Sequence, residues 1–412
     1  MEKTQENYPN LISAEIIKGS KNQFGEKIVT FKLVMPRFIL AEFNTHRLFS
    51  RNSASSRAIP FRKMVKSVLD TPFIPIAFQK DHTGMQGFEY LDNSQEYSLP
   101  EILSVLSNVF KYKDDLEIDK HIFRLLEEIY ESNEDVSATL QEWWSYCSKK
   151  VTKSAILMAS LGVTKQIANR ILEPFMYHTV LVTATEWENF FELRCPKYRT
   201  PVTQLIEPQR SWKDLINAHG NEINIKLLEE NRNNIIFKLQ HNEGAGEIHI
   251  MDLAEKMWDA YNEYEFEELK EGEWHIPFNI KGDESKFPLY KQKIWENKQA
   301  PTNGHIELAI KVATARCARI SYETLGDSPV IDYEKDIKLH DDLLSMGHMS
   351  PFEHCAKVMN NEEYYSHIKS IKGDGFTVSD EKDIYLDTVI GIEDAGWSRN
   401  FKGFQQYREI IE

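Results

Sequence analysis

The chain has 412 residues, of which 41% are hydrophobic and 27% are charged, and its formal net charge at pH 7 is −15. This composition is typical of a folded protein with a substantial core, and the length exceeds that of one small domain. The negative charge argues against a general binder of nucleic acid or anionic membranes, because such proteins present a basic face. We therefore expect two or three domains, or one large domain with insertions, and neither nucleic acid nor a membrane as partner.

The N-terminal sequence MEKTQENYPN is polar and lacks the apolar core of a signal peptide, and the longest apolar run, AILMASLGV, is too short to span a bilayer. Four scattered cysteines form no CxxC pair: Cys147, Cys195, Cys317 and Cys355. Such spacing fits reduced thiols better than a disulfide framework or a zinc site. These features predict a cytoplasmic protein.

Residues 11–35 hold two β-rich runs, LISAEIIKG and KIVTFKLVM, around the turn residues NQFGE, and predict a β-hairpin. Pro36 follows, and the apolar residues of RFILAEFNTHRLFS recur at helical spacing. We expect the stretch THRLFSRNSASSR, residues 45–57, to end this helix and run into a loop broken by Pro60.

Residues 72–100 are irregular, and residues 101–194 are mostly helical in pattern. Helices are expected over EILSVLSNVFKY, HIFRLLEEIYE, SATLQEWWSYCSKKVTKSAILMASLG and KQIANRILEPF, and TEWENFFELR closes this half. Residues 195–248 are polar, as in an insertion, with a helix near 222–240. The run IMDLAEKMWDAYNEYEFEEL predicts a further amphipathic helix.

Residues 271–303 contain several prolines and glycines and are the expected linker between residues 1–270 and residues 304–412. After it, HIELAIKVATARCARISY and EKDIKLHDDLLSM predict two helices, and Gly347 is placed to cap the second. HMSPFEH follows directly. The sequence as a whole predicts an α+β fold in which helix dominates.

A basic patch over residues 43–69 contains no acidic residue and six cations: Arg47, Arg51, Arg57, Arg62, Lys63 and Lys66. Arginine forks match phosphate oxygens, and serine hydroxyls supply further hydrogen bonds. The patch therefore suits a phosphorylated small molecule. A solvated basic turn is the alternative, since charge runs usually are solvated.

Two other polar clusters invite a chemical interpretation. His348, Glu353 and His354 carry metal-ligand groups, but Pro351 breaks the helix between them, so we expect a polar loop and no metal site. Cys195 lies among cationic neighbours that lower a thiol pKa, yet a bystander thiol is the favoured interpretation. The chain has no GxGxxG, GxxxxGK[ST], HExxH or GxSxG motif.

Three stretches that lie far apart in the sequence carry patterns that are specific when they occur together. THRLFSRNSASSR keeps six of the eight named positions of R-H-R-x-x-S-x-N-E-x-S-x-R and departs at Thr45 and Ser53. NRILEPF with TEWENFFELR is similar to R-x-x-L-P and N-F-x-x-L-R, and ARCARISY with GHMSPFEH is similar to A-A-R-V-S-Y and G-H-x-S-P-F-E-H. These three patterns resemble the flavin-dependent thymidylate synthases (ThyX).

The order of the stretches differs from that family, in which the A-A-R-V-S-Y and G-H-x-S-P-F-E-H patterns precede the R-H-R signature. Here they follow it, as in a circular permutation with residues 271–303 as the new joint. The resemblance covers roughly half of the chain and leaves residues 195–248 and 356–412 without a counterpart. It implies a ThyX-like mixed α/β core with large helical additions.

The resemblance also implies an activity. The family transfers a one-carbon unit from methylenetetrahydrofolate to C5 of dUMP, and FAD relays hydride from NADPH. No enzyme cysteine attacks the pyrimidine. The family assembles as a homotetramer with FAD and nucleotide at subunit interfaces, so the resemblance implies a homo-oligomer with interfacial active sites.

Residue roles carry over position by position. Arg194 takes the place of the arginine that stabilises charge on the pyrimidine, and Ser55 and His348 are the other candidate catalytic residues. The implied cofactor contacts are His46, Arg47, Asn52, Asn189, Ser321, Ser350 and Glu353. The implied substrate contacts are Glu42, Ser53, Ser55, Ser56, Arg57, Arg170 and Arg194.

Several positions depart from the family pattern. Glu42 stands in place of Gln, Ser53 in place of Glu, and Thr183 and Thr185 in place of Asn and Arg. A carboxylate at Glu42 favours an exocyclic amino group such as that of cytosine, so a dCMP methylase or hydroxymethylase is one alternative. A non-catalytic nucleotide-binding relative is another. The basic, aromatic end WSRNFKGFQQYR either adds nucleotide contacts or is a packed segment, and the second is favoured.

Overall fold

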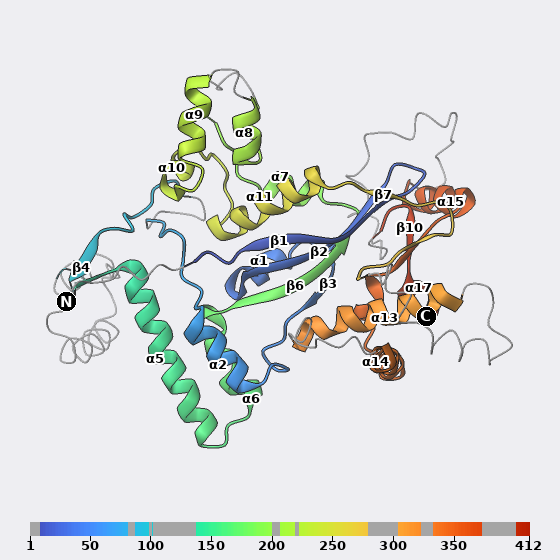
Figure 1. Ribbon diagram of the computed structural model, residues 1–412, viewed down its shortest axis with the longest axis horizontal. Helices are drawn as coiled ribbons and strands as arrows, with labels where there is room; N and C mark the ends of the chain where they lie inside the picture. The colour runs from blue at the N-terminus through green and yellow to red at the C-terminus, as the bar shows by residue number, and fades with distance from the viewer. Residues whose placement is uncertain are drawn as a thin grey trace.

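The structure, a computed structural model, describes residues 9–80, 87–98, 101, 137–199, 207–218, 222–278, 304–322, 333–372 and 401–412. These residues form a five-stranded sheet, two smaller sheets and helices packed around them (Figure 1). This mixed helix and sheet content agrees with the expected α+β class. In the described ranges, no helix has both the length and the apolar composition that a membrane crossing needs.

The five-stranded sheet has the order β3-β6-β2-β1-β7. Its strands are β1 (Ser13–Lys21), β2 (Lys27–Pro36), β3 (Ser50–Ser53), β6 (Tyr177–Ala184) and β7 (Glu267–Glu268). Neighbouring strands are antiparallel, except that β7 runs parallel to β1. The long pairing of β2 with both β1 and β6 makes β2 the centre of the sheet.

The hairpin predicted over residues 11–35 is confirmed as β1 and β2. Its turn is closed by the Asn22 side chain, which accepts hydrogen bonds from the backbone nitrogens of Phe24 and Glu26, both at 3.0 Å. Gly25 has φ 85°, a conformation that glycine adopts without a steric penalty. The turn residues therefore set the register of the two strands.

The expected helix after Pro36 is much shorter in the structure, and the prediction that residues 45–57 run from helix to loop is wrong. The 3-10 helix η1 (Arg37–Ile39) and the helix α1 (Leu40–Phe43) end at Phe43, and β3 follows. Phe43 and Phe49 still pack together, with ring centroids 5.6 Å apart, because the chain turns between them. Their apolar spacing therefore comes from the turn and not from a continuous helix.

The strand β6 was also missed, because residues 101–194 look mostly helical in sequence. Its sequence YHTVLVTA is buried almost throughout, so it lacks the alternating pattern of a half-buried strand. A short apolar run of this kind cannot be told from a buried helix by periodicity alone. Its pairing with β2 on one side and β3 on the other is a tertiary feature.

One face of the sheet carries α7 (Glu188–Arg194) and α11 (Ile248–Glu263). Aromatic rings pack α7 against the sheet and against α1. Phe31 of β2 lies edge-on to Trp187, just before α7, at 5.1 Å, and Phe43 of α1 lies edge-on to Phe190 at 5.7 Å. Fully burying one such side chain contributes about 1.5–3 kcal/mol. The helices expected at TEWENFFELR and at IMDLAEKMWDAYNEYEFEEL are both confirmed, the second ending at Glu263.

A helical layer formed by α2 (Phe61–Asp70), α5 (Leu140–Ser160), α6 (Lys165–Ala168) and the 3-10 helix η2 (Arg170–Phe175) extends from the sheet (Figure 1). The predicted helix over SATLQEWWSYCSKKVTKSAILMASLG is confirmed as α5, which begins with a capping box between Thr139 and Glu142. Pro174 lies inside η2, so KQIANRILEPF is only partly α-helical. The expected helices within residues 102–131 lie outside the described residues.

The remaining elements of the first half are short. They are β4 (Glu96–Ser98), β5 (Ser137–Thr139), α8 (Trp212–Ala218), α9 (Glu222–Glu230) and α10 (Ile235–Gln240). The single helix expected near residues 222–240 is thus two helices. Asn234 separates them and caps the second, since its side chain accepts a hydrogen bond from the Phe237 nitrogen.

The C-terminal part contains short strands and helices. They are β8 (Trp274–His275), α13 (Gly304–Arg319), η4 (Ile320–Tyr322), α14 (Tyr333–Ser345), η5 (Ser350–Glu353), β9 (Ala356–Val358), α15 (Asn361–Lys372), β10 (Phe404–Gln406) and α17 (Tyr407–Ile411). The predicted cap at Gly347 is confirmed: its φ is 71°, and the His348 nitrogen donates to the Leu343 carbonyl at 3.0 Å. The boundary at residues 271–303 stays a prediction, although β8 already pairs with β9.

The C-terminal tail is packed, as favoured from its sequence, over its described residues 401–412. Phe401 and Phe404 are 1% exposed, and β10 pairs with β9. Gly403 touches the hairpin turn, where an added Cβ would lie 2.4 Å from the Asn22 side-chain nitrogen. The tail is therefore an integral part of the fold.

A buried polar network joins the sheet to the C-terminal part. His275 lies between the hydroxyls of Ser20 and Thr30, with both distances 2.9 Å. The Thr30 hydroxyl contacts that of Thr183 at 2.7 Å, and Thr183 contacts His354 Nδ1 at 2.8 Å. Because buried polar groups are costly when unpaired, this chain of contacts fixes β1, β2, β6, β8 and the end of η5 relative to one another.

The buried histidines predict a pH dependence of stability. Burial lowers the pKa of His354 to about 3, and burial, Lys18 and His354 lower the pKa of His275 well below its usual value. The unfolded chain binds protons at these histidines below pH 6.5 and the folded chain does not, so stability is lost as pH falls from 6.5 toward 3. Each histidine should cost about 1.4 kcal/mol between pH 7.5 and pH 5.5.

Urea unfolding at both pH values measures this loss. His354→Asn should reduce the pH-dependent loss by about the contribution of one histidine, roughly 1.4 kcal/mol, whatever its effect on stability at pH 7.5. An unchanged loss in the variant contradicts the assignment of a neutral, buried His354.

Candidate functional site

Three of the candidate residues meet where α1 ends and α7 ends. The Arg194 guanidinium forms an ion pair with the Glu42 carboxylate through Nη1 and Oε1. Its Nε donates to His46 Nε2 at 3.3 Å. The Arg194 and Glu42 side chains are 21% and 28% exposed, so part of each is open to solvent. We call these three residues the Arg194 cluster.

His46 is held between aromatic rings. It stacks on Phe49 at 5.7 Å and meets Phe190 edge-on at 4.9 Å. Burial, then Arg194 and Arg51, lower the pKa of His46 to about 4. The imidazole is therefore neutral near pH 7, and because Nε2 accepts from Arg194, the proton is on Nδ1. His46 can position Arg194 without adding a second positive charge.

Glu42 experiences opposing effects. Burial raises its pKa, Arg194 lowers it, and Glu247 raises it further, with a net upward shift. The ion pair thus places the hydrogen-bond acceptors of the Glu42 carboxylate beside the hydrogen-bond donors of the Arg194 guanidinium, and both side chains are partly buried. A planar heterocycle whose edge carries both donors and acceptors can bind such a pair through two or more hydrogen bonds.

Arg51 connects the Arg194 cluster to the C-terminal part. Its Nη1 donates to the carbonyls of Phe43 and His46, at 3.3 Å and 3.2 Å. Burial lowers the pKa of Arg51, and the negative charge of Glu353 opposes this shift. Glu353 itself accepts a hydrogen bond from Arg408 at 2.6 Å. Sequence patterns include Arg51 only in the basic patch and Arg408 only in the basic, aromatic C-terminal end, because the contacts of both join distant segments.

The candidate phosphate contacts lie on the loop after β3 and at the start of η2. The Ser56 hydroxyl donates to Glu173 at 2.5 Å, and the Ser55 nitrogen donates to the Ser321 carbonyl at 3.0 Å. Arg57 and Arg170 are exposed. Ser53 is half-buried in β3. Two of the arginines therefore face solvent, while Ser56 already contacts a carboxylate.

The candidate flavin contacts fall into two groups. Four of them contact other parts of the chain: His46, Asn52, Ser321 and Glu353. The others are exposed: Arg47, Asn189 and Ser350. His348, one of the candidate catalytic residues, is exposed as well. The structure thus places three of the seven at the surface and packs the other four against other segments of the chain.

Cys195 is confirmed as a buried thiol. It is 2% exposed and its sulfur donates to the Ala254 carbonyl at 3.6 Å. Burial outweighs the cation Arg210 and raises its pKa. A thiol in this state is a poor nucleophile near neutral pH. Among the described residues, no group of three or more His, Cys, Asp or Glu is arranged to hold a metal ion.

The burial of the cysteines predicts how they react with a thiol reagent. All four are free, and Cys147 is exposed while the other three are buried. The folded protein should therefore react with Ellman's reagent at one thiol, and Cys147→Ala should react at none until it is unfolded. Rapid modification of Cys195 in the folded Cys147→Ala protein contradicts its placement as a bystander.

Comparison with known proteins gives limited information. No protein-family model and no curated protein matches the chain. Two solved structures of the UMP/dUMP methylase PolB from Streptomyces cacaoi are similar to part of it. The complex with 5-Br dUMP has a TM-score of 0.30 and 12% identity over 61% of this chain and 90% of PolB. The complex with 5-Br UMP has a TM-score of 0.28 and 14% identity over 57% and 93%. A TM-score this low supports no argument about function.

Proposed function

We propose that the chain is a pyrimidine-nucleotide methyltransferase that transfers a one-carbon unit from methylenetetrahydrofolate to C5 of dUMP. The proposal rests on the resemblance of three stretches to the flavin-dependent thymidylate synthases. The observation that carries it is that these stretches, distant in the sequence, lie together in the folded chain. A chance resemblance would not require them to meet.

The contacts between the stretches are specific. The Asn52 side chain donates to the Cys317 carbonyl at 3.4 Å across 265 positions of sequence, and the Ser55 nitrogen donates to the Ser321 carbonyl. In Figure 1, β3 runs beside α13 and the C-terminal elements. The contact of Arg194 with Glu42 and His46 then joins the second stretch to the first.

Arg194 supplies the proposed electrostatic catalysis. C5 of the pyrimidine is the nucleophile that attacks the one-carbon unit, and a fixed guanidinium that stabilises negative charge at N3 and O2 makes the ring more electron-rich at C5. Losing one donor of this kind typically costs about 2.7–4 kcal/mol of transition-state stabilisation. His46 and Glu42 keep the guanidinium in one orientation, so less reorganisation is needed when the charge develops.

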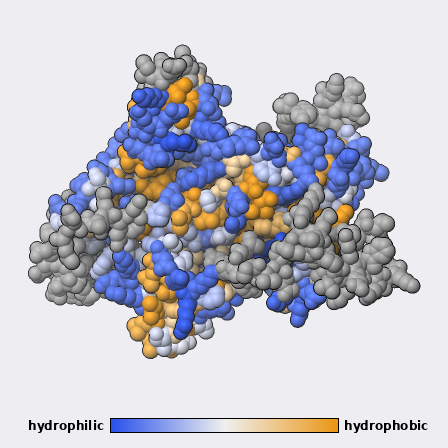
Figure 2. Space-filling view, viewed as in Figure 1, coloured by the Kyte–Doolittle hydropathy of each residue, from blue (hydrophilic) through white to orange (hydrophobic). Residues whose placement is uncertain are grey.

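FAD and NADPH remain part of the proposal, on the resemblance alone. The one-carbon unit of methylenetetrahydrofolate is at the oxidation level of formaldehyde, so a methyl product needs two electrons that FAD and NADPH would supply. The proposal includes a homo-oligomer, because the resemblance implies FAD and nucleotide sites at subunit interfaces. Exposed apolar side chains at the ends of α5 and α6 offer surface for assembly (Figure 2): Ile156, Leu157, Leu161 and Ile167.

The ion pair between Glu42 and Arg194 favours a second candidate, a dCMP methylase or hydroxymethylase. Cytosine presents two neighbouring acceptors, O2 and N3, that match the guanidinium fork, and an amino group that can donate to the carboxylate. Uracil can use the pair too, with N3–H on Glu42 and O2 on Arg194. A hydroxymethyl product forms by addition of water to the methylene unit and needs no reductant.

Release of tritium from C5-labelled nucleotides tests the reaction. With methylenetetrahydrofolate, FAD and NADPH, the protein should release tritium from dUMP, because C5 loses its hydrogen when the one-carbon unit is added. Release from dCMP alone supports the second candidate, and release without NADPH supports hydroxymethylation. If neither nucleotide loses tritium, the protein is not a C5 transferase and a non-catalytic nucleotide-binding role replaces the proposal.

Arg194→Ala tests the electrostatic role. The variant should lower kcat by about 100-fold or more, because it removes a donor whose effect is largest in the transition state. Lys197→Ala is a matched control, since Lys197 is a nearby cation that pairs with the exposed Glu192. A kcat for Arg194→Ala within twofold of the control contradicts the role given to Arg194.

A further inference from the structure

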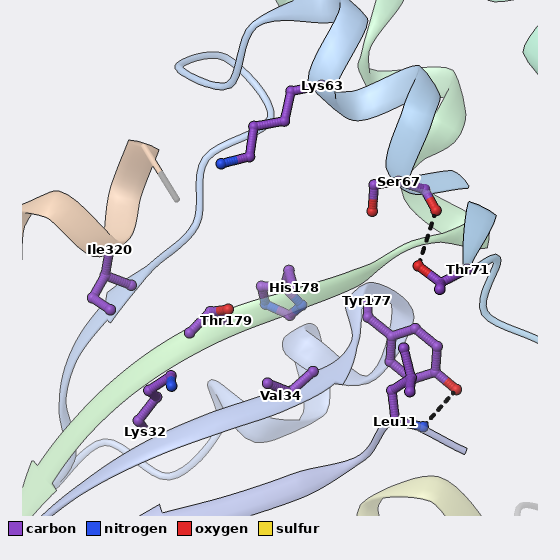
Figure 3. A pocket seen from close by; sticks show the side chains of 10 residues that line it. All are labelled: Leu11, Lys32, Val34, Lys63, Ser67, Thr71, Tyr177, His178, Thr179 and Ile320. Carbon is purple, nitrogen blue, oxygen red and sulfur yellow. Dashed lines mark hydrogen bonds between the residues drawn. The ribbon is translucent and has the colours of Figure 1, made fainter. Parts of the chain in front are cut away.

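Residues 54–59 join β3 to α2, and three of the candidate substrate contacts lie among them. We call these residues the β3–α2 loop. The loop begins at a pocket of about 300 Å³ beside α2, which Thr179 helps to line (Figure 3). The Ala54 nitrogen donates to the Thr179 carbonyl at 2.8 Å, so the start of the loop is fixed to β6. None of the loop residues lines the pocket, so other contacts determine the course of the loop after Ala54.

The side-chain amide of Asn169 holds this loop at two points. Its nitrogen Nδ2 donates to the carbonyls of Ser56 and Ile59, at 2.7 Å and 3.0 Å. These carbonyls lie on either side of Arg57 in the sequence, and Asn169 is fully buried immediately before η2. Because a carbonyl oxygen only accepts hydrogen bonds, the amide has to present its nitrogen here. Asn169 therefore supplies both donors.

This arrangement has a cost for the stability of the fold. The side-chain oxygen of Asn169 is buried and has no hydrogen-bond partner among the described residues. A buried acceptor without a partner lowers the stability of a protein. The amide thus leaves one of its own groups unpaired while it fixes two points of the β3–α2 loop.

The same hydrogen bonds set the directions of two backbone N–H groups. In a trans peptide the C=O and the N–H point in opposite directions, and no peptide bond of the described chain is cis. Since the Ser56 carbonyl points at the buried Asn169, the Arg57 N–H points away from Asn169. The Ser55 carbonyl accepts from the Ala58 nitrogen at 2.9 Å, so the Ser56 N–H points away from that turn. Neither N–H has a hydrogen-bond acceptor in the part of the chain that the structure describes.

Three further side chains hold the loop. The Lys165 ammonium donates to the Ala58 carbonyl at 2.9 Å, and Arg37 donates to the first carbonyl of the loop at 3.2 Å. The Ser56 hydroxyl donates to Glu173 at 2.5 Å. Ser56 is thus an anchor of the loop, and its hydroxyl is already engaged.

We propose that Asn169 is a positioning residue for the phosphate of the nucleotide substrate, and that Lys165 assists it. Asn169 keeps the Arg57 N–H turned outward, beside the exposed Arg57 side chain. Backbone N–H groups and arginine forks are common donors to phosphate oxygens. A loop that is ordered before binding loses less conformational entropy when the phosphate binds. The inference rests on the proposed function, because it takes dUMP as the ligand.

Calorimetric titration of the full chain with dUMP and with deoxyuridine tests the inference, because the two differ only in the phosphate. Asn169→Ala should weaken dUMP binding about tenfold and leave deoxyuridine binding within about twofold of the wild type. Thr152→Ala is its control, since this buried hydroxyl donates to the Ser148 carbonyl of its own helix at 2.8 Å. Lys165→Met, at an exposed position, should weaken dUMP binding about threefold relative to Lys153→Met, which removes an exposed lysine of α5.

Hydrogen exchange over residues 54–60 tests the loop without a ligand. The nitrogens of Ala58 and Ile59 donate to the Ser55 carbonyl in the ordered loop. In Asn169→Ala these two amides should exchange about tenfold faster than in Thr152→Ala, because the loop loses two of its fixed points. Equal exchange in the two variants would show that Asn169 does not hold the loop.

Other results would also overturn the inference. Equal weakening of dUMP and deoxyuridine binding in Asn169→Ala would mean that the variant perturbs the fold in general. Should Asn169→Ala not fold, dUMP binding in Lys165→Met that equals the binding in Lys153→Met would overturn the inference. If tritium release fails while dUMP binding depends on Asn169, only the proposed reaction is wrong. If tritium is released while dUMP binding does not depend on Asn169, only this inference is wrong.

Discussion

The arrangement of this protein depends on a buried hydrogen-bond network between the central strands and the C-terminal part. Thr183 on β6 contacts both Thr30 on β2 and His354 after η5, and His275 extends the network to β1. These groups are fully buried, and losing hydrogen bonds between buried polar groups is costly, so the network stabilises this one arrangement. The network therefore holds the segment after Gly347 against β6, although Thr183 and His354 are 171 positions apart in the sequence.

That placement explains the electrostatics of the candidate site. Glu353, which accepts a hydrogen bond from Arg408, opposes the lowering of the Arg51 pKa by burial. Arg51 in turn donates hydrogen bonds to the carbonyls of Phe43 and His46. His46 stays neutral and accepts from Arg194. The C-terminal tail is thus connected to the Arg194 cluster through Glu353 and Arg51. The tail and the cluster therefore form one unit.

Local sequence signals were sufficient for elements that local interactions determine. Asn22 and Gly25 closed the predicted hairpin, Gly347 capped its helix, and α5 began at a residue able to form a capping box. Local signals were insufficient for β3 and β6, because these strands are determined by pairing between distant segments. That pairing outweighed the helical spacing of apolar residues before and within THRLFSRNSASSR, and the helical pattern of the region before Arg194. The residues of the site divide in the same way. Glu42, His46 and Arg194 were identified from sequence motifs. The contacts of Arg51 and Arg408 join distant segments, so no local pattern reveals them. The pocket beside α2 was missed because the segments that line it come together only in the folded chain.

The central claim is that the joined segments hold a pyrimidine nucleotide with its base on Arg194. A crystal structure of the protein with dUMP measures this directly. The account predicts hydrogen bonds from the Arg194 guanidinium to the base, with Glu42 beside its edge, in a site completed within one chain or by a second copy. A well-ordered nucleotide whose base contacts neither Arg194 nor Glu42 of any copy contradicts the account.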